Sequence, residues 1–433
     1  MKRKIYSDLL EWKNTKNNIK PLMILGVRQC GKTYIIDEFC KNEYKNYIYV
    51  NLLEMNNIVE LYQSNLTSDE KYNRLKILLN FDIDMEDTIL FIDEIQESEE
   101  IISELKYFCE RHNNVRIICA GSLLGVKLKR TKFSFPVGKV KMLNLYPMNF
   151  EEFLLAMGEN LLINIIRESF ENNKKIGEQV HEKALNLYKI YLITGGMPES
   201  IQSMINSESN YIKYDTSILP DILSSCIKDM NKYVTNEVEA LRINRVYNSI
   251  PSQLTNNKFQ YSNVAKDARS REYATSIDWL EASNMVLRCK CVKLPEIPLE
   301  GFVDDETFKL YFSDVGILNS KLKISIENIL NNDVSLYKGI IAENYIANEL
   351  ISNKHDLYYW KNNATAEVDF LINTKDGIIP IEVKAGDNTQ SKSLNVYKDL
   401  YNPPYAIRIS TKDFGFNPET KIKSVPLYAA FLI

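Results

Sequence analysis

The sequence predicts an α/β protein whose N-terminal part is built on a doubly wound parallel sheet. Three observations predict it. An apolar run at 22–25 leads into a glycine-containing loop and an amphipathic helix, a second run ends in two acids at 93–94, and a third, VRIICAGS, ends in small polar residues. Adding the apolar runs between them, we expect strands near 22–25, 47–52, 88–92, 115–119 and 139–145.

Length and composition narrow the class of protein. The 433 residues correspond to about three domains. Hydrophobic residues make up 45% of the chain, but no apolar run is long enough to cross a bilayer, so we expect a cytoplasmic protein without a membrane partner. Seven scattered cysteines suggest reduced thiols, and three isolated histidines argue against a zinc site.

Charge is unevenly distributed along the chain. The net charge is −4, which excludes a generally basic nucleic-acid coat. Residues 240–293 nevertheless hold nine Lys or Arg against four Asp or Glu, a local excess of five positive charges. This segment is therefore the part of the chain where contact with nucleic acid is most plausible.

The stretch Gly26-x4-Gly31-Lys32-Thr33 has the spacing of a phosphate-binding loop. Glycines let backbone N–H groups surround phosphates, and the following helix directs its N-terminus at them. Lys32 is expected to reach the β- and γ-phosphates and Thr33 to ligate Mg²⁺. The predicted ATP site comprises Gly26, Val27, Arg28, Gln29, Cys30, Gly31, Lys32 and Thr33.

Acidic residues follow the strand at 88–92. Asp93 and Glu94 lie where the strand ends, at the sheet edge that binds ligands in α/β proteins. Asp93 can support Mg²⁺ and Glu94 can polarise the attacking water, a pairing that favours hydrolysis over passive binding. Ser122 could sense the γ-phosphate, although an ordinary turn explains it equally well.

Several stretches, taken in order, resemble the prokaryotic AAA-type ATPases that carry a C-terminal domain of unknown function. They are GVRQCGKT, LFIDEIQ, ICAGS, LNLYPMNFEEFL, YLITGGMPESI, LYFSDVGIL and EVDFLI with IPIEVKAG, and they cover nearly the whole chain. One departure is Gly138-Lys139, where these ATPases usually have Gly-Arg. Arg111, Arg116 and Arg130 are alternatives for an arginine acting on a neighbouring subunit, and the sequence does not choose among them.

The expected domains are an ATPase core at 1–155, a helical lid at 156–235, a winged helix-turn-helix at 236–303 and a last domain at 304–433. The resemblance supports the lid and the winged helix. We expect three helices followed by a strand pair in VLRCKCVKL, with a recognition helix beginning near Ser270. Lys266, Arg269 and Arg271 would then contact DNA phosphates. The alternative is a winged helix that binds protein.

The last domain contains a predicted hairpin, AEVDFLI and IIPIEVKAG, joined at Asp376-Gly377. A two-residue turn there pairs Lys375 with Ile378 and places Asp369 on the same face as Glu382 and Lys384. A register shifted by a single residue would move Asp369 to the other face.

This pattern, with a helical acid before it, resembles the restriction-endonuclease-like PD-(D/E)xK core. The resemblance implies that Asp369, Glu382 and Glu343 hold Mg²⁺ and that Lys384 is the catalytic lysine. Ala366-Glu367-Val368 stands where the name-giving Pro-Asp could be, and Gln390 and Lys392 begin a helix expected to contact DNA. The alternative is an edge hairpin with a cross-strand Asp–Lys pair.

We therefore expect an ATP-hydrolysing AAA-type ATPase that uses ATP and Mg²⁺ and is coupled to DNA binding or processing. One alternative is a nucleotide-gated regulatory or scaffold protein with an inactive nuclease-like fold. Another is an ATPase acting on an unrelated client. The sequence leaves open the substrate, whether the nuclease-like site is active, and the oligomeric state, a homo-oligomer included.

Overall fold

The computed structural model describes residues 1–433 except 113, 123–124, 127–134, 235, 267, 332, 334–336, 363–365 and 387–391, and it leaves the side chains of 231–233 undescribed. The chain forms two compact units. The N-terminal unit comprises residues 2–146 with 282–284, and the C-terminal unit comprises 147–281 with 285–433.

The N-terminal unit is built on a five-stranded parallel sheet with strand order β2-β3-β4-β1-β5. Its strands are β1 (Leu22–Leu25), β2 (Asn46–Asn51), β3 (Thr88–Asp93), β4 (Arg116–Ala120) and β5 (Lys141–Asn144). All five strands expected from the sequence are present, so the prediction of a parallel α/β sheet is confirmed. Strand β3 is buried along its whole length, as its uninterrupted apolar run requires.

Helices connect these strands. They are α1 (Ile5–Lys13), α2 (Lys32–Glu43), α3 (Asn56–Gln63), α4 (Ser68–Leu79), η1 (Ile95–Glu97) and α5 (Glu99–Arg111). Helix α2 is the amphipathic helix predicted after the glycine-containing loop, and it buries Ile35, Ile36 and Phe39. Because these residues fix one face of α2 in the core, the N-terminus of the helix is held at the end of β1.

The C-terminal unit begins with helices. They are α7 (Phe150–Ala156), α8 (Asn160–Asn172), α9 (Glu178–Thr194), α10 (Pro198–Asn206), α11 (Ile218–Tyr233), α12 (Glu237–Gln253), η2 (Tyr261–Asn263) and α13 (Ser270–Ala282). The GGMP stretch separates α9 from α10, and Pro198 stands at the first turn of α10, where a missing N–H costs nothing. Within the described residues, no helix has the length and apolar character needed to cross a membrane.

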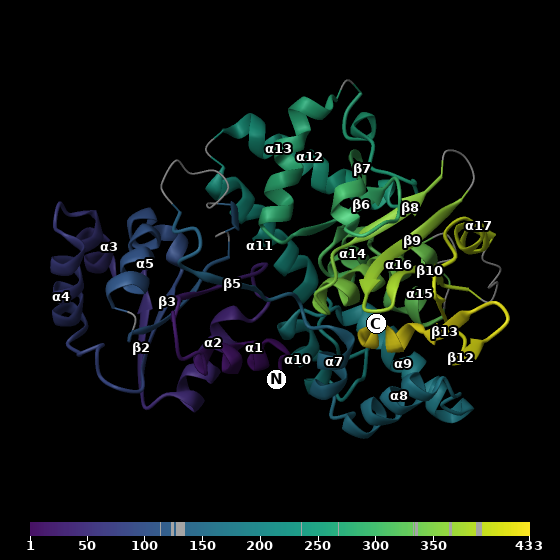
Figure 1. Ribbon diagram of the computed structural model, residues 1–433, viewed down its shortest axis with the longest axis horizontal. Helices are drawn as coiled ribbons and strands as arrows, with labels where there is room; N and C mark the ends of the chain where they lie inside the picture. Colours follow the sequence, from purple (N-terminus) through teal and green to yellow (C-terminus); the bar gives the residue numbers. More distant parts are fainter. Residues whose placement is uncertain are drawn as a thin grey trace. The chain divides into compact units, whose positions relative to one another are not determined.

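A mixed sheet of eight strands follows, in the order β12-β13-β11-β10-β9-β8-β6-β7. Its strands are β6 (Val286–Val292), β7 (Val303–Phe312), β8 (Tyr358–Lys361), β9 (Glu367–Thr374), β10 (Gly377–Lys384), β11 (Ala406–Ser410), β12 (Gly415–Asn417) and β13 (Ile422–Pro426). The remaining elements are η3 (Leu299–Phe302), α14 (Val315–Leu322), α15 (Ile326–Leu330), α16 (Lys338–Ser352), α17 (Lys392–Tyr401) and η4 (Leu427–Leu432). Helix α16 contacts β7 and β10, and α17 contacts β9 and β10 (Figure 1).

The stretch VLRCKCVKL is a single strand and not the pair that the sequence predicted. It forms β6, whose antiparallel partner is β7, and β6 also pairs with β8 in parallel. Residues 286–292 therefore belong to the same sheet as the C-terminal strands, across the predicted boundary at 303–304. The reason is the alternation of Leu287, Cys289 and Cys291: these apolar side chains are buried on one face, so the strand is a part of the sheet interior.

The register of the β9–β10 hairpin also differs from the predicted one. Thr374 pairs with Gly377, so Lys375 and Asp376 form the turn and the expected pair of Lys375 with Ile378 is wrong. Gly377 takes a φ of +118°, which a residue with a Cβ adopts only with strain. The shift is two residues, and because side chains alternate with period two, Asp369 keeps the predicted face.

Two motifs singled out in the sequence, GGMPE and YFSDVG, pack against each other. Asp314 accepts hydrogen bonds from the Gly196 N–H at 2.6 Å and from the Ile317 N–H at 2.9 Å, which caps α14. A Cβ on Gly195 would lie 2.2 Å from Asp314 Oδ1, and one on Gly316 would lie 2.6 Å from Gly195 N. Gly195, with a φ of +62°, therefore leaves room for the Asp314 carboxylate, and Gly316 leaves room for the backbone of Gly195.

Candidate functional site

The phosphate-binding loop follows β1 in the N-terminal unit. Gln29 and Gly31 have φ values of +60° and +92°, so the backbone curls before α2 begins at Lys32. Lys32 is 7% exposed, and its Nζ donates to the carbonyl oxygens of Gly26 and Val27, each at 2.8 Å. The ammonium is thus fixed over the loop at the place where phosphates would bind.

Within the same unit, Arg3 supports the loop. Its guanidinium donates to Cys30 O at 2.9 Å and to Tyr146 O at 2.6 Å, while the Cys30 thiol lies 3.4 Å from Leu145 O. The side chain of Cys30 is fully buried, whereas Arg28 is exposed. Sequence reasoning missed Arg3, because nothing in MKRKIY distinguishes a loop-bracing arginine from a solvated one.

The acid pair lies beside this loop. The Thr33 hydroxyl donates to Asp93 Oδ2 at 2.9 Å, and the Tyr49 hydroxyl reaches the same oxygen at 3.2 Å. Burial, followed by the nearby Asp93 charge, raises the pKa of Tyr49 to about 12, so its hydroxyl keeps its proton and acts as a donor. Asp93 and Thr33 are therefore already oriented towards each other, as a shared Mg²⁺ site requires.

Glu94 follows β3 in a left-handed conformation, with a φ of +53°. The Gln96 amide donates a hydrogen bond to Glu94 Oε2. Ser122 lies two residues beyond β4, the strand between β3 and the phosphate-loop strand β1, so it is at the same sheet edge as Asp93. The structure thus brings Lys32, Thr33, Asp93, Glu94 and Ser122 to one edge of the parallel sheet.

Two of the arginines considered for action on a neighbouring subunit have partners inside the N-terminal unit. Arg111 forms an ion pair with Asp69 at 3.1 Å, and Arg116 donates to Thr15 O at 2.8 Å. Lys139 pairs with Glu110 at 2.8 Å. Arg130 lies outside the described residues.

A second cluster of ionisable side chains lies in the C-terminal unit. It comprises the carboxylates of Glu343 on α16, Glu367 and Asp369 on β9 and Glu382 on β10, together with the ammonium groups of Lys309 on β7 and Lys384 on β10. We refer to these six residues as the acidic cluster. Sequence reasoning found four of them and missed Lys309, which is buried in the middle of an apolar strand, and the role of Glu367 beside it.

Hydrogen bonds and ion pairs organise the cluster. Asp369 Oδ2 accepts from the Val383 N–H at 2.7 Å, just beyond the last paired residues of the β9–β10 ladder. Lys384 Nζ lies 2.6 Å from Glu382 Oε1. Asp369, Glu382 and Lys384 are therefore gathered as the sequence predicted.

Glu343, the fourth predicted member, is held from β7. The Tyr311 hydroxyl donates to Glu343 Oε2 at 3.1 Å, and Lys309 Nζ lies 3.4 Å from the same oxygen. The helical acid is thus brought to the cluster by α16 and oriented by two side chains of one strand face.

The electrostatics show unbalanced negative charge. Burial, with the charges of Glu343 and Glu382, raises the pKa of Asp369 well above its usual value. Burial also raises the pKa of Glu382, against the attraction of Lys384. Burial disfavours charge on Lys309, but Glu343 and Glu367 outweigh it and raise the pKa of that lysine. Two carboxyls therefore favour a proton, which a divalent cation could replace.

The donor set fits a hard cation such as Mg²⁺. Within the described part of the chain, Glu367 Oε2 and Glu382 Oε2 are buried and accept no hydrogen bond, and carboxylate oxygens are the ligands that Mg²⁺ prefers. As the side chains stand, no group of three or more His, Cys, Asp or Glu among the described residues is arranged to hold a metal ion. The lysines instead occupy one oxygen on each of three carboxylates.

The predicted recognition helix is α13. Lys266, Arg269 and Arg271 are exposed where α13 begins, and the charged groups of their side chains have no hydrogen-bond or ion-pair partner among the described residues. Gln390 lies outside the described residues, whereas Lys392 begins α17 as expected.

The fold of the N-terminal unit and its phosphate-binding site indicate the class of protein domain. A parallel sheet with a phosphate loop after β1 and an acid pair after β3 is the arrangement of a P-loop nucleotide-binding domain. Residues 18–154 match the family described as "AAA domain". Residues 185–341 and 338–429 match two families described as "Domain of unknown function (DUF8612)" and "Domain of unknown function (DUF4143)". The chain thus combines an AAA-type P-loop ATPase domain with two domains of unknown function.

Several solved structures are similar to this chain, with low sequence identity and low TM-scores. The Walker-type ATPase PABY2304 of Pyrococcus abyssi is 16% identical with a TM-score of 0.41, covering 75% of this chain and 96% of that one. The ORC2 protein of Aeropyrum pernix is 10% identical with a TM-score of 0.36, covering 76% and 93%. Drosophila ORC bound to DNA is 12% identical with a TM-score of 0.31, covering 73% and 94%. No curated protein matches the sequence.

Proposed function

We propose that the chain is an ATP hydrolase whose nucleotide cycle is coupled to DNA binding or processing, with a metal-dependent phosphodiesterase site in its C-terminal unit. The observation that carries the proposal is the position of Asp369. It lies on the hairpin face of Glu382 and Lys384, with Glu343 beside it, in a chain that also has a P-loop ATPase domain.

In the ATPase site, the loop backbone and Lys32 would bind the phosphates of ATP. The Lys32 ammonium would exchange two carbonyl acceptors for phosphate oxygens, which are stronger acceptors because they are charged. Glu94 would orient and polarise the attacking water once its carboxylate leaves Gln96. Ser122 could contact the γ-phosphate from the end of β4.

In the C-terminal site, Asp369 and Glu382 would be the principal metal ligands, and Glu343 would contribute from α16. Mg²⁺, when bound at either site, supplies neutralisation of the charge on phosphate oxygens. Lys384 would donate to the phosphodiester or to the attacking water. Thr33 and Asp93 would hold the cation of the ATPase site.

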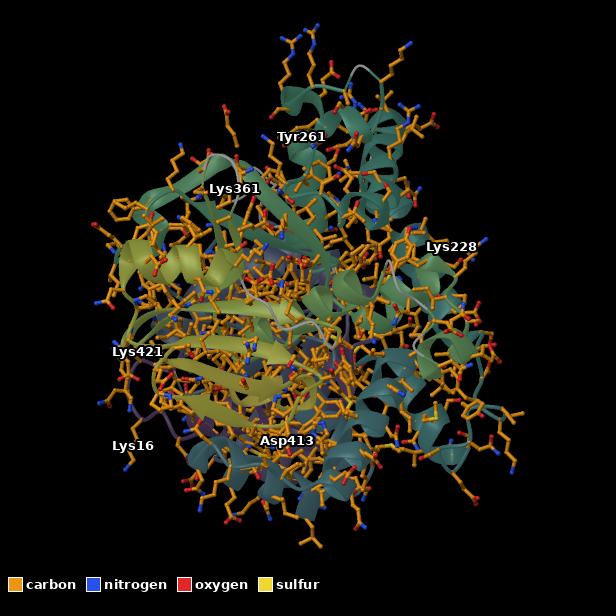
Figure 2. The ribbon with its side chains drawn as sticks, turned by 90° about the vertical axis from the view of Figure 1, so that its right-hand side faces the viewer. Lys16, Lys228, Tyr261, Lys361, Asp413 and Lys421 are labelled. Atoms are coloured by element: carbon orange, nitrogen blue, oxygen red, sulfur yellow. The ribbon has the colours of Figure 1, made fainter. Side chains whose placement is uncertain are left out.

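The segment before the eight-stranded sheet supports DNA contact. The Phe259 N–H donates to Phe308 O at 2.7 Å, and the two rings stack at 5.6 Å, so the connection between α12 and α13 is attached to β7. Tyr261, labelled in Figure 2, lies on this connection and packs edge-on against Phe259. Helices followed by such strands support a winged helix, with Lys266, Arg269 and Arg271 available for phosphates.

DNA cleavage tests the nuclease part. Supercoiled, linear and branched DNA would be incubated with the protein and Mg²⁺ or Mn²⁺, comparing wild type with Glu382→Ala and with Glu306→Ala, an exposed acid on β7. We expect Glu382→Ala to lower the cleavage rate by roughly a hundredfold or more, the upper range for changes around metal sites. Equal rates in wild type and Glu382→Ala would remove the acidic cluster from any cleavage.

A second function has an observation in its favour. Because the described side chains are not arranged to hold a metal, the C-terminal unit could be an inactive nuclease-like fold that binds a partner under nucleotide control. The same experiment separates the two: no cleavage of any DNA with either metal, together with DNA-independent ATP hydrolysis, would favour this regulatory function.

A further inference from the structure

Lys309 is the cation that the sequence patterns did not include. It is 7% exposed on β7, its Nζ lies 2.6 Å from Glu367 Oε1 and 3.4 Å from Glu343 Oε2, and it is 5.3 Å from the centre of the Tyr359 ring. The lysine is therefore enclosed by two carboxylates and an aromatic face. Its ammonium group is a fixed positive charge between these carboxylates, and ions from solvent cannot easily take its place.

The charges of the acidic cluster can be counted. Four carboxylates (Glu343, Glu367, Asp369, Glu382) and two ammonium groups (Lys309, Lys384) leave 4 − 2 = 2 negative charges when all are ionised. Arg408 neighbours Glu382 in the register of β10 and β11, but its Nη2 donates to Ser424 Oγ at 3.0 Å. One divalent cation would neutralise the two remaining negative charges of the cluster.

Two buried carboxylate oxygens of the acidic cluster also lack a positive partner. Lys309 and Lys384 each take one oxygen from Glu367 and Glu382, and the second oxygen of each of these carboxylates is buried without a partner in the described part of the chain. Such oxygens are costly unless a proton or a cation satisfies them. The Glu382 side chain is only 5% exposed, so water satisfies little of this need.

We infer that Lys309 is a built-in cation that replaces a second metal ion, so that the acidic cluster binds a single divalent cation. Lys309 is a positioning residue: it fixes Glu343 and Glu367 and limits the charge available to metal. This inference rests on the proposed metal-dependent function of the cluster. Without Lys309 the cluster would carry 4 − 1 = 3 negative charges, enough to attract a second cation.

Calorimetric and electron-paramagnetic-resonance titration of the full chain with Mn²⁺, without nucleotide, tests the inference. Binding that is lost in Glu382→Ala is assigned to the cluster. We expect a single such ion in wild type and in Lys309→Arg. We expect either a second ion in Lys309→Met or an affinity for the first ion raised by about tenfold or more, because a positive charge has gone.

Lys309→Met leaves buried carboxylates unpaired and could fail to fold, so Lys309→Met/Glu367→Gln is the second variant. It removes one charge of each sign, and we expect it to bind a single ion with an affinity near that of wild type. Two ions in wild type, unchanged binding in Lys309→Met, or two ions in the double variant would overturn the role of Lys309. An absence of any Mn²⁺ dependent on Glu382 would instead contradict the proposed function, and the inference with it.

Discussion

The Thr33 hydroxyl donates a hydrogen bond of 2.9 Å to Asp93 Oδ2, which joins the end of the phosphate loop to the end of β3. These residues are 60 positions apart in the chain and meet because β1 and β3 end at the same edge of a parallel sheet. The fold of the parallel sheet therefore brings into contact the two side chains that are expected to share Mg²⁺.

Replacement of Lys32 tests the phosphate loop. We expect Lys32→Ala to lower ATP hydrolysis by roughly a hundredfold or more, since a preorganised charge on the transferred phosphate is lost. Lys41→Ala is the matched control, because Lys41 is an exposed lysine on the same helix, paired with Asp37. Phosphate release would be measured for both, and wild-type turnover in Lys32→Ala would exclude this lysine from the mechanism.

Replacement of Glu94 separates binding from hydrolysis. Glu94→Gln keeps the shape of the side chain but removes the base, so we expect hydrolysis to fall by roughly 10²- to 10⁴-fold while ATP affinity changes little. Equilibrium binding of a fluorescent ATP analogue and phosphate release would be compared, with Glu86→Gln, an exposed acid before β3, as the control. A parallel loss of binding would mean that Glu94 supports the loop.

The exposed charges at the start of α13 predict a salt-dependent effect. Replacing Lys266, Arg269 and Arg271 together by alanine should weaken DNA binding and reduce the slope of log affinity against log salt by up to about three. Binding would be followed by fluorescence anisotropy over a salt series. The triple variant of Lys174, Lys175 and Lys213, all exposed elsewhere, serves for comparison. Identical slopes in the two variants would argue for a protein-binding surface.

Asp314 predicts a dependence of stability on pH. Burial, opposed by backbone N–H donors, raises the pKa of Asp314 from 3.8 to about 6. A raised carboxyl pKa means that the folded state binds the additional proton, so this contribution is present below pH 4 and lost as the pH rises through 6. It amounts to about 3 kcal/mol at most.

Asp314→Asn removes this titration, and the Asn oxygen can still cap α14. We expect the unfolding free energy of the variant to fall less between pH 4 and pH 6 than that of wild type. Urea unfolding at several pH values measures both slopes. Equal slopes would show that the backbone donors keep Asp314 ionised in the folded state over this range.

The sequence predicted the parallel sheet well, because strands buried on both faces appear as uninterrupted apolar runs such as TILFID. It also placed Asp369 with Glu382 and Lys384, although the turn lies at Lys375 and Asp376. The face was right because a shift of two residues leaves the alternation of side chains unchanged.

Long-range neighbours could not be predicted in the same way. Lys309 follows Phe308 in β7 and is recognisable only when α16 and β9 bring Glu343 and Glu367 to it. Arg3 supports the phosphate loop across 27 residues of chain. The pairing of β6 with β8 likewise depends on tertiary contacts that no local pattern in VLRCKCVKL reveals.

Steady-state ATP hydrolysis with and without duplex, single-stranded and junction DNA measures whether the nucleotide cycle is coupled to DNA. Glu94→Gln gives the background. We expect at least one form of DNA to raise the rate of ATP hydrolysis by wild type several-fold, and we expect this rise to be lost in the Lys266/Arg269/Arg271 variant. An unchanged rate with every form of DNA, together with no DNA binding at low salt, would contradict it.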